Sequence, residues 1–235
     1  LNSNMIQIEA EYYAVARPKS AQIEGIRQKS SLKKRGVEFI EIRSLDLNPF
    51  SKVGIDRDTI LFLELFIIFC LTTQSKKLDK ESMKTINHND LTVAKYGRRP
   101  NLLLTRNANR VLMKSWGNEI LEKMTPIAEQ IDNSDEEYLT NIATMRSRLA
   151  DTDETPSAQI LDELNSKKIN QTELGNTLGY QYKEHYLAKE KSENNLWETL
   201  DEERKQSLIK QKELEITTAE SGKSFHEFKN DYYKS

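Results

Sequence analysis

Apolar and polar side chains alternate in residues 5–12, MIQIEAEY. This period of two is typical of a β-strand with one buried face, and it puts Tyr13 on the face opposite the aliphatic side chains. Pro18 has no backbone N–H to donate to a neighbouring strand, so we expect the strand to end at residues 17–19. A short helix is expected over residues 21–29.

A second alternating segment covers residues 37–45, VEFIEIRSL, and the NPF sequence at residues 48–50 predicts a turn after it. Glu41 and Arg43 lie two positions apart, so they share one strand face. Charged side chains need partners when they are buried. Two interpretations remain open. One is a mutual ion pair, which stabilises a fold little; the other is a site where Glu41 binds a metal ion and Arg43 binds phosphate.

From residue 59 onward the apolar spacing becomes helical. Residues 59–72 predict a buried helix that Asp56 or Asp58 caps, with Cys70 as a small core residue. Pro126 should kink or interrupt a second helix, and Pro156 suits the first turn of another. Helices are expected over residues 118–131, 134–149, 156–164 and 184–215. The first of them contains Pro126, and the third begins at Pro156.

The composition and charge of the chain narrow the classes of protein and ligand to consider. The 235 residues are 37% hydrophobic and 31% charged, which fits a globular chain, and the strands-then-helices order predicts one α+β domain. Residues 1–110 hold 19 basic and 12 acidic side chains, and the remainder holds 16 and 25. The basic first part suits an anionic ligand such as a nucleotide, although glutamate-rich helices explain the asymmetry equally well. The net charge of −2 gives no general attraction to nucleic acid or membrane.

Several common site signatures are absent from the sequence. It contains neither a GxxxxGK[ST] phosphate loop nor a GxGxxG dinucleotide fingerprint, and its three histidines fit no zinc pattern. The apolar run at residues 60–71 is shorter than the about 20 residues that a membrane span needs. The single cysteine excludes an intrachain disulfide and fits a reducing cytosol.

Three segments resemble a known family. Residues 6–19, IQIEAEYYAVARPK, resemble the segment IQIENELYxxIRPK of proteobacterial glutamate–cysteine ligases. Residues 36–51, GVEFIEIRSLDLNPFS, are similar to that family's GVxYIEVRSLDxNPFSPxG. Residues 97–100, GRRP, resemble an EGRKP element, with Tyr96 where the family has glutamate. The match is dense over residues 5–72 and thinner beyond.

The resemblance implies an α+β fold related to glutamine synthetase. An antiparallel sheet would line the active site, with residues 1–58 as active-site strands and residues 59–235 as a mainly helical remainder. It also implies a cytoplasmic, ATP-dependent ligase that uses Mg²⁺ or Mn²⁺. ATP would phosphorylate the γ-carboxylate of glutamate, and the amine of cysteine would attack this acyl phosphate. The product would be γ-glutamylcysteine, in the first step of glutathione biosynthesis.

The same resemblance implies roles for four residues. Glu41 matches a metal-ligand position, and Arg43 matches a position that contacts the transferred phosphoryl group. Tyr13 matches a position that contacts the cysteine substrate at its carboxylate, and Arg17 is a candidate for binding an anionic group. The implied partners are the small molecules glutamate, cysteine and ATP, with no nucleic acid and no membrane.

Proteins of that family are much longer than this chain. The missing N-terminal half would supply most metal-binding carboxylates, so we expect the chain alone to be inactive. The first alternative is a non-catalytic binding module that retains the fold, which the presence of Glu41 and Arg43 disfavours. A helical interaction protein built on residues 184–215 is disfavoured because they lack a sustained apolar heptad. A fused bifunctional glutathione synthase would need an ATP-binding domain after residue 235.

Overall fold

The structure is a computed structural model that describes residues 14–21, 26–75, 77–132, 134–188 and 196–234. The chain divides into two compact units, one made of Leu1–Asp46 with Leu187–Ser235 and the other of Leu47–Tyr186. The described residues are mostly helical and form two small antiparallel sheets, β1–β2 and β3–β4. At this level the expected mixture of antiparallel strands and helices is confirmed. The strand expected at residues 5–12 lies outside the described residues.

The first unit contains one of the two sheets. Its elements are β1 (Ala16–Lys19), α1 (Gln28–Arg35), β2 (Phe39–Ile42), α8 (Leu196–Ser221) and α9 (Phe225–Lys234). The helix expected at residues 21–29 forms later in the chain, as α1. Gly36, with a φ of 81°, ends that helix by donating its backbone N–H to Leu32 O. Basic residues fill the last turn of α1, where the helix dipole favours them.

β1 ends at Lys19, within the residues 17–19 where a strand end was expected, but Pro18 is not the reason, because it lies inside β1 opposite Ile40. Arg43 donates its backbone N–H to Val15 O at 2.9 Å, just beyond the paired residues. Hydrogen-bonded positions alternate along an antiparallel ladder, so Pro18 falls at a position where no N–H has to be donated to β2. A proline is tolerated in a strand at such a position.

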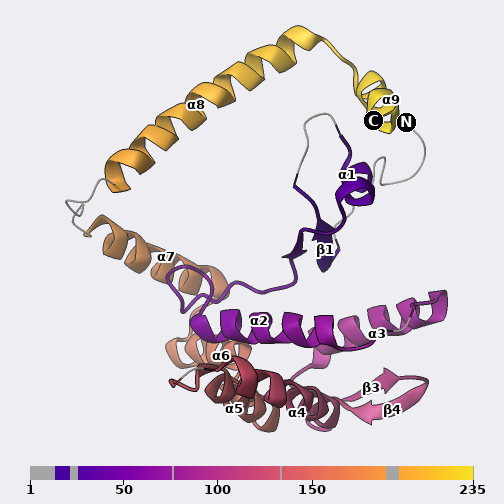
Figure 1. The fold of residues 1–235 in the computed structure, drawn as a ribbon. Helices are drawn as coiled ribbons and strands as arrows, with labels where there is room; N and C mark the ends of the chain where they lie inside the picture. The colour runs from indigo at the N-terminus through magenta and orange to yellow at the C-terminus, as the bar shows by residue number, and fades with distance from the viewer. Residues whose placement is uncertain (1–13, 22–25, 76, 133, 189–195, 235) are drawn as a thin grey trace. The chain divides into compact units, whose positions relative to one another are not determined.

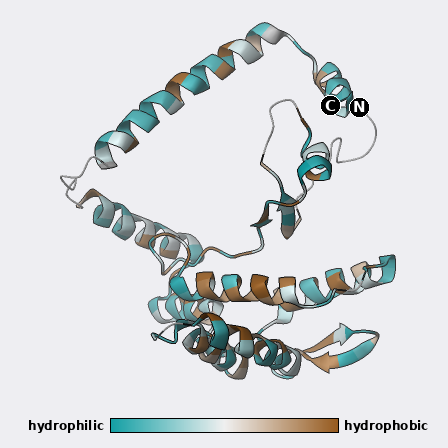
Figure 2. Ribbon diagram, viewed as in Figure 1, coloured by the Kyte–Doolittle hydropathy of each residue, from teal (hydrophilic) through white to brown (hydrophobic). Residues whose placement is uncertain are grey.

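The second unit holds the hydrophobic core. Its elements are α2 (Arg57–Thr72), α3 (Lys80–Tyr96), β3 (Leu103–Arg106), β4 (Asn109–Leu112), α4 (Met113–Ile131), α5 (Glu137–Ala150), a 3-10 helix (Thr152–Glu154), α6 (Pro156–Lys167) and α7 (Gln171–Leu187). Helices α2, α4 and α5 pack against one another (Figure 1), and Figure 2 shows apolar residues concentrated along α2. The core cluster consists of Leu65, Leu121, Met124, Ala128 and Ile142.

Three helix predictions are confirmed. Asp56 caps α2 by accepting a hydrogen bond from Thr59 N at 2.7 Å. Thr155 caps α6, with Pro156 in its first turn. The apolar residues predicted for 134–149 line the core side of α5. In each case the prediction rests on residues a few positions apart, and the structure has the predicted cap or apolar face.

Pro126 does not interrupt its helix, because α4 runs through it as one element. An internal proline costs a helix about 3 kcal/mol. Leu121, Met124 and Ala128 flank Pro126 and are almost completely buried against α2 and α5. This packing on both sides of the proline offsets the lost backbone hydrogen bond.

The expected burial of α2 was wrong in part. Leu61 and Leu65 are buried, but Cys70 is exposed and Leu71 is 75% exposed. An apolar helix that is hydrophobic all round has no single core face in its sequence, so the pattern could not show which side would be covered in this chain. None of the helices in the described ranges is both long enough and apolar enough to cross a membrane.

The helix expected over residues 184–215 is confirmed in its described parts by the end of α7, which closes at Leu187, and by α8, which begins at Leu196; residues 189–195 lie outside the described residues. The β3–β4 hairpin was missed. Its two turn residues, Asn107 and Ala108, have φ values of 50° and 64°, which is the geometry of a tight two-residue hairpin turn.

Candidate active site

The β1–β2 ladder brings four charged side chains onto one face. Arg17 pairs directly with Glu41 across the two strands, and paired residues in an antiparallel ladder point to the same side. Arg43 donates from Nε to Glu41 Oε1 at 2.9 Å, and Lys19 Nζ lies 3.5 Å from Glu41 Oε2. Glu41 is therefore the one carboxylate among these four charged groups.

The surroundings of Glu41 keep it ionised. The hydrogen bond from Arg43 lowers the pKa of the Glu41 carboxyl, and partial desolvation opposes this to a smaller extent. The charges of Arg43 and Lys19 lower the pKa further. Glu41 Oε2 is shielded from solvent and accepts no hydrogen bond from any described residue. An ionised carboxylate oxygen in this condition is suited to a cation.

The sequence predictions are only partly assembled by the described chain. Arg17, Glu41 and Arg43 lie together, whereas Tyr13 lies outside the described residues. Within the described ranges, no three His, Cys, Asp or Glu side chains gather in a way that could hold a metal ion. Among the described residues, Glu41 therefore belongs to no such group. Lys19 was missed, although its position two residues after Arg17 placed it on the same strand face.

The segment after β2 folds into a tight loop in the second unit. The predicted turn is present, since Asn48 Oδ1 accepts the Phe50 N–H at 3.0 Å. Asn48 Nδ2 also donates to the capping residue Asp56, at 2.7 Å. Two tyrosines of α7 hold the loop through its carbonyl groups: Tyr182 donates to Pro49 O at 2.7 Å, and Tyr186 donates to Lys52 O at 3.3 Å. Their spacing of four residues was the only local signal, and it cannot reveal a distant partner.

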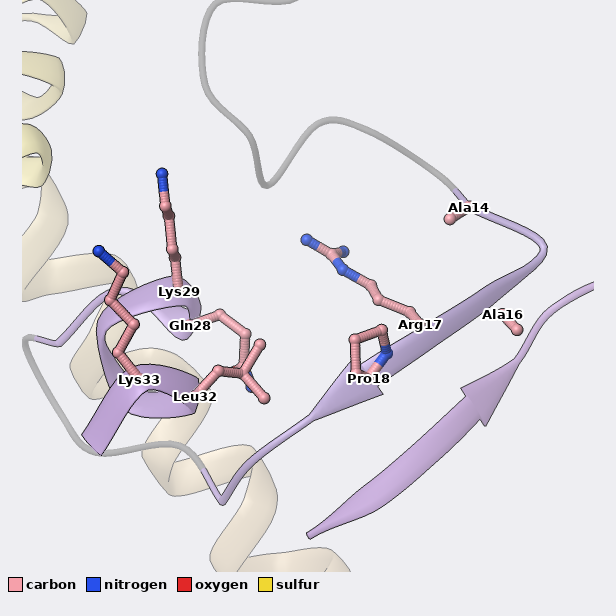
Figure 3. A pocket seen from close by; sticks show the side chains of 8 residues that line it. All are labelled: Ala14, Ala16, Arg17, Pro18, Gln28, Lys29, Leu32 and Lys33. Atoms are coloured by element: carbon pink, nitrogen blue, oxygen red, sulfur yellow. The ribbon is translucent and has the colours of Figure 1, made fainter. Parts of the chain in front are cut away.

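A cavity of about 460 Å³ lies between α1 and β1 in the first unit, and we call it the α1–β1 groove (Figure 3). It is lined by Ala14, Ala16, Arg17, Pro18, Gln28, Lys29, Leu32 and Lys33. Arg17 therefore belongs both to the charged face around Glu41 and to this groove. Sequence reasoning did not identify Lys29 or Lys33, because their position depends on how α1 packs beside β1.

Comparison of the sequence with known proteins shows which family it matches. A family model described as glutamate–cysteine ligase matches residues 1–93. Proteins named glutamate–cysteine ligase from Janthinobacterium sp. and Saccharophagus degradans are 35% and 32% identical to this chain over 234 and 237 aligned residues. The chain belongs to the glutamate–cysteine ligase family. A third glutamate–cysteine ligase, from Pseudomonas savastanoi pv. phaseolicola, is 41% identical over 163 residues, which is 68% of this chain.

The chain spans less than half the length of these relatives. The alignments cover 44% of the Janthinobacterium and Saccharophagus proteins and 30% of the Pseudomonas protein. A crystal structure of glutamate–cysteine ligase from Francisella tularensis in complex with AMP is similar over 99% of this chain and 45% of its own, with a TM-score of 0.86 and 31% identity. A bifunctional glutathione synthetase from Pasteurella multocida shares the fold over 76% of this chain, with a TM-score of 0.56 and 20% identity.

Proposed function

We propose that this chain forms part of the active site of an ATP-dependent ligase that joins the γ-carboxylate of glutamate to the amine of cysteine. The reaction would pass through γ-glutamyl phosphate and would begin glutathione biosynthesis. Family membership supports the choice of substrates, and the AMP bound in the Francisella protein supports a nucleotide. The substrates are then the small molecules glutamate, cysteine and ATP.

The observation that carries the proposal is the arrangement of Glu41 and Arg43. Glu41 Oε1 accepts a hydrogen bond from Arg43 Nε at 2.9 Å, which orients the guanidinium group. Glu41 Oε2 accepts no hydrogen bond from the described residues. One oxygen thus positions the arginine, and the other, which lies 3.5 Å from Lys19 Nζ, would bind the metal ion.

Each residue then has a distinct role. Arg43 contacts the phosphoryl group during its transfer, because a guanidinium fork matches phosphate oxygens. Glu41 contributes one ligand to Mg²⁺ or Mn²⁺, and the metal, when bound, neutralises charge on the phosphates. Arg17 binds an anionic group beside them, and Tyr13 binds the carboxylate of cysteine. Arg43 and, to a smaller extent, Lys19 lower the pKa of Glu41 and so favour its ionised form.

The proposal includes a glutamine-synthetase-like fold in the cytoplasm and an active site that this chain does not complete. Mg²⁺ takes six ligands, usually one or two carboxylates together with waters and substrate phosphates, and in this proposal the described residues contribute Glu41. The remaining protein ligands belong to the part of the relatives that the alignments leave uncovered. The chain alone is then inactive.

The test is ADP release with glutamate, cysteine and Mg-ATP. We would compare this chain with a chimera in which it replaces the matching part of a full-length relative. Cysteine-dependent ADP release by the chimera, and none by the chain alone, is the expected result. Absence of turnover in a folded chimera would contradict the ligase proposal and favour a binding module that retains the fold.

A further inference from the structure

The α1–β1 groove combines apolar walls with three cations. Ala14, Ala16, Pro18 and Leu32 provide the apolar surface, whereas Arg17, Lys29 and Lys33 provide the charge. The eight described residues that line the groove include no aspartate or glutamate. We propose that the groove is a binding site for a small molecule that carries several phosphate groups.

Some basic residues of the first unit have an acidic partner among the described residues, and others, which include the three groove cations and Lys34, have none. Lys19 and Arg43 both lie beside Glu41, and Arg35 pairs with Glu38. For Arg17, Lys29 and Lys33, by contrast, the described residues provide neither an ion pair nor a side-chain hydrogen bond. Three cations around one cavity raise the local concentration of anions.

The arrangement on α1 is unfavourable unless an anion is present. Lys29 and Lys33 are four residues apart on a helix, and like charges at this spacing destabilise it. Figure 3 shows the Lys29 and Lys33 amines extending from α1 and the Arg17 guanidinium extending from β1 toward α1. A bound anion with several charges would relieve this repulsion at all three positions.

Phosphate is the anion that fits this set of side chains. A guanidinium binds two phosphate oxygens through parallel hydrogen bonds, and lysines add strongly hydrated point charges. Three separate cations favour a chain of phosphates over a single carboxylate. The volume of about 460 Å³ lies within the usual range of small-molecule sites, and the apolar walls leave room for a non-phosphate part.

This proposal goes beyond the ligase site. Lys29 and Lys33 have no role in the proposed chemistry, and only Arg17 is shared. Phosphate groups could come from the nucleotide of the ligase reaction or from another phosphorylated compound. Both share the chemistry that the groove recognises, and a binding experiment can separate them.

The experiment is isothermal titration calorimetry on the full 235-residue chain, in EDTA and at low ionic strength, with inorganic tripolyphosphate as the probe. We expect saturable binding that weakens as salt screens the charges. Lys29→Gln and Lys33→Gln should each weaken binding by about fivefold, the upper range for exposed ion pairs. Lys34→Gln is the matched control, because Lys34 is an exposed lysine of α1 that does not line the groove.

The titrations can either support or overturn the proposed phosphate site. Absence of tripolyphosphate binding, or equal weakening by Lys34→Gln and Lys29→Gln, would overturn the proposal. Far-UV circular dichroism would establish that the variants keep their helices. Titrations with ATP and with adenosine identify the source: tighter binding of ATP than of tripolyphosphate points to the nucleotide, and equal binding points to other phosphorylated compounds. Because no turnover is measured, failure here leaves the ligase proposal intact, and failure of the ligase assay leaves the groove intact.

Discussion

Arg17 and Glu41 face each other directly across the β1–β2 ladder. Lys19 and Arg43 approach the same carboxylate from one position further along each strand face. Glu41 therefore pairs with two of the three cations on this strand face, Lys19 and Arg43. The same carboxylate is our candidate metal ligand, so its structural and chemical roles have to be separated by experiment.

Glu41→Gln separates these roles when it is made in the active chimera. The amide keeps the size and one carbonyl oxygen of the side chain but loses its charge. We expect kcat to fall by at least about tenfold and the Mg²⁺ concentration for half-maximal rate to rise, because a metal ligand is weakened. Initial rates measured over a range of Mg²⁺ concentrations test both effects.

Glu38→Gln is the control for this substitution. Glu38 is a carboxylate just before β2 that pairs with Arg35, outside the Glu41 cluster. Its loss should leave the metal dependence unchanged. If the Glu41 and Glu38 variants respond to Mg²⁺ in the same way, Glu41 is not a metal ligand.

Arg43→Lys tests the phosphoryl contact. A lysine keeps the positive charge but cannot offer two parallel N–H donors. We expect kcat in the chimera to fall by about 10- to 100-fold with a smaller change in the KM for ATP, since the contact strengthens as charge develops on the transferred group. Arg35→Lys, an equivalent change at an exposed ion pair, should leave kcat unchanged. Wild-type kinetics for Arg43→Lys would remove Arg43 from the site.

The sequence revealed those parts of the fold whose signals are local. The caps of α2 and α6 and the apolar spacing of α5 depend on residues a few positions apart. The burial of α2, by contrast, depends on which helices cover it. The integrity of α4 through Pro126 depends on packing against distant residues, which outweighs a local propensity.

The same division applies to the candidate site. A strand period of two was enough to place Glu41 and Arg43 on one face. The pairing of Arg17 with Glu41 depends on the register between two strands separated by α1, and no local pattern sets that register. The cations of α1 beside β1 likewise required the structure. Local periodicity thus found half of the cluster, and tertiary packing supplied the other half.

Met124→Ala should destabilise the second unit. The Met124 side chain is completely buried between α2, α4 and α5. Truncation of such a residue leaves a cavity and typically costs about 2–5 kcal/mol in the free energy of unfolding. Urea denaturation of the chain, followed by circular dichroism, measures the loss. Met83→Ala is the matched control, because Met83 on α3 is 44% exposed; we expect it to change stability by less than about 0.5 kcal/mol. Equal effects would contradict the assigned core.

Glu119 makes the stability of the second unit depend on pH. Arg106 Nη2 donates to Glu119 Oε1 at 3.1 Å, and Lys123 Nζ donates to the same oxygen at 2.7 Å. The hydrogen bond from Arg106, followed by that from Lys123, lowers the pKa of Glu119 from 4.5 to about 2. A carboxyl whose pKa is lower in the folded state binds protons more readily in the unfolded state. Its stabilising contribution is complete above about pH 4.5 and is lost as the pH falls toward about 2.

Glu119→Gln should therefore reduce the urea midpoint at neutral pH and make its decline between about pH 4.5 and pH 2 shallower than in the wild type. The comparison is a series of urea melts across this range. Glu122→Gln serves as the control, since Glu122 is an exposed carboxylate on the same helix, and its melts should follow the wild-type slope. Because Glu119 is itself partly exposed, high salt should shrink the difference between wild type and variant. If the Glu119 variant declines as steeply as the wild type, the Arg106–Glu119–Lys123 cluster does not couple protonation to folding.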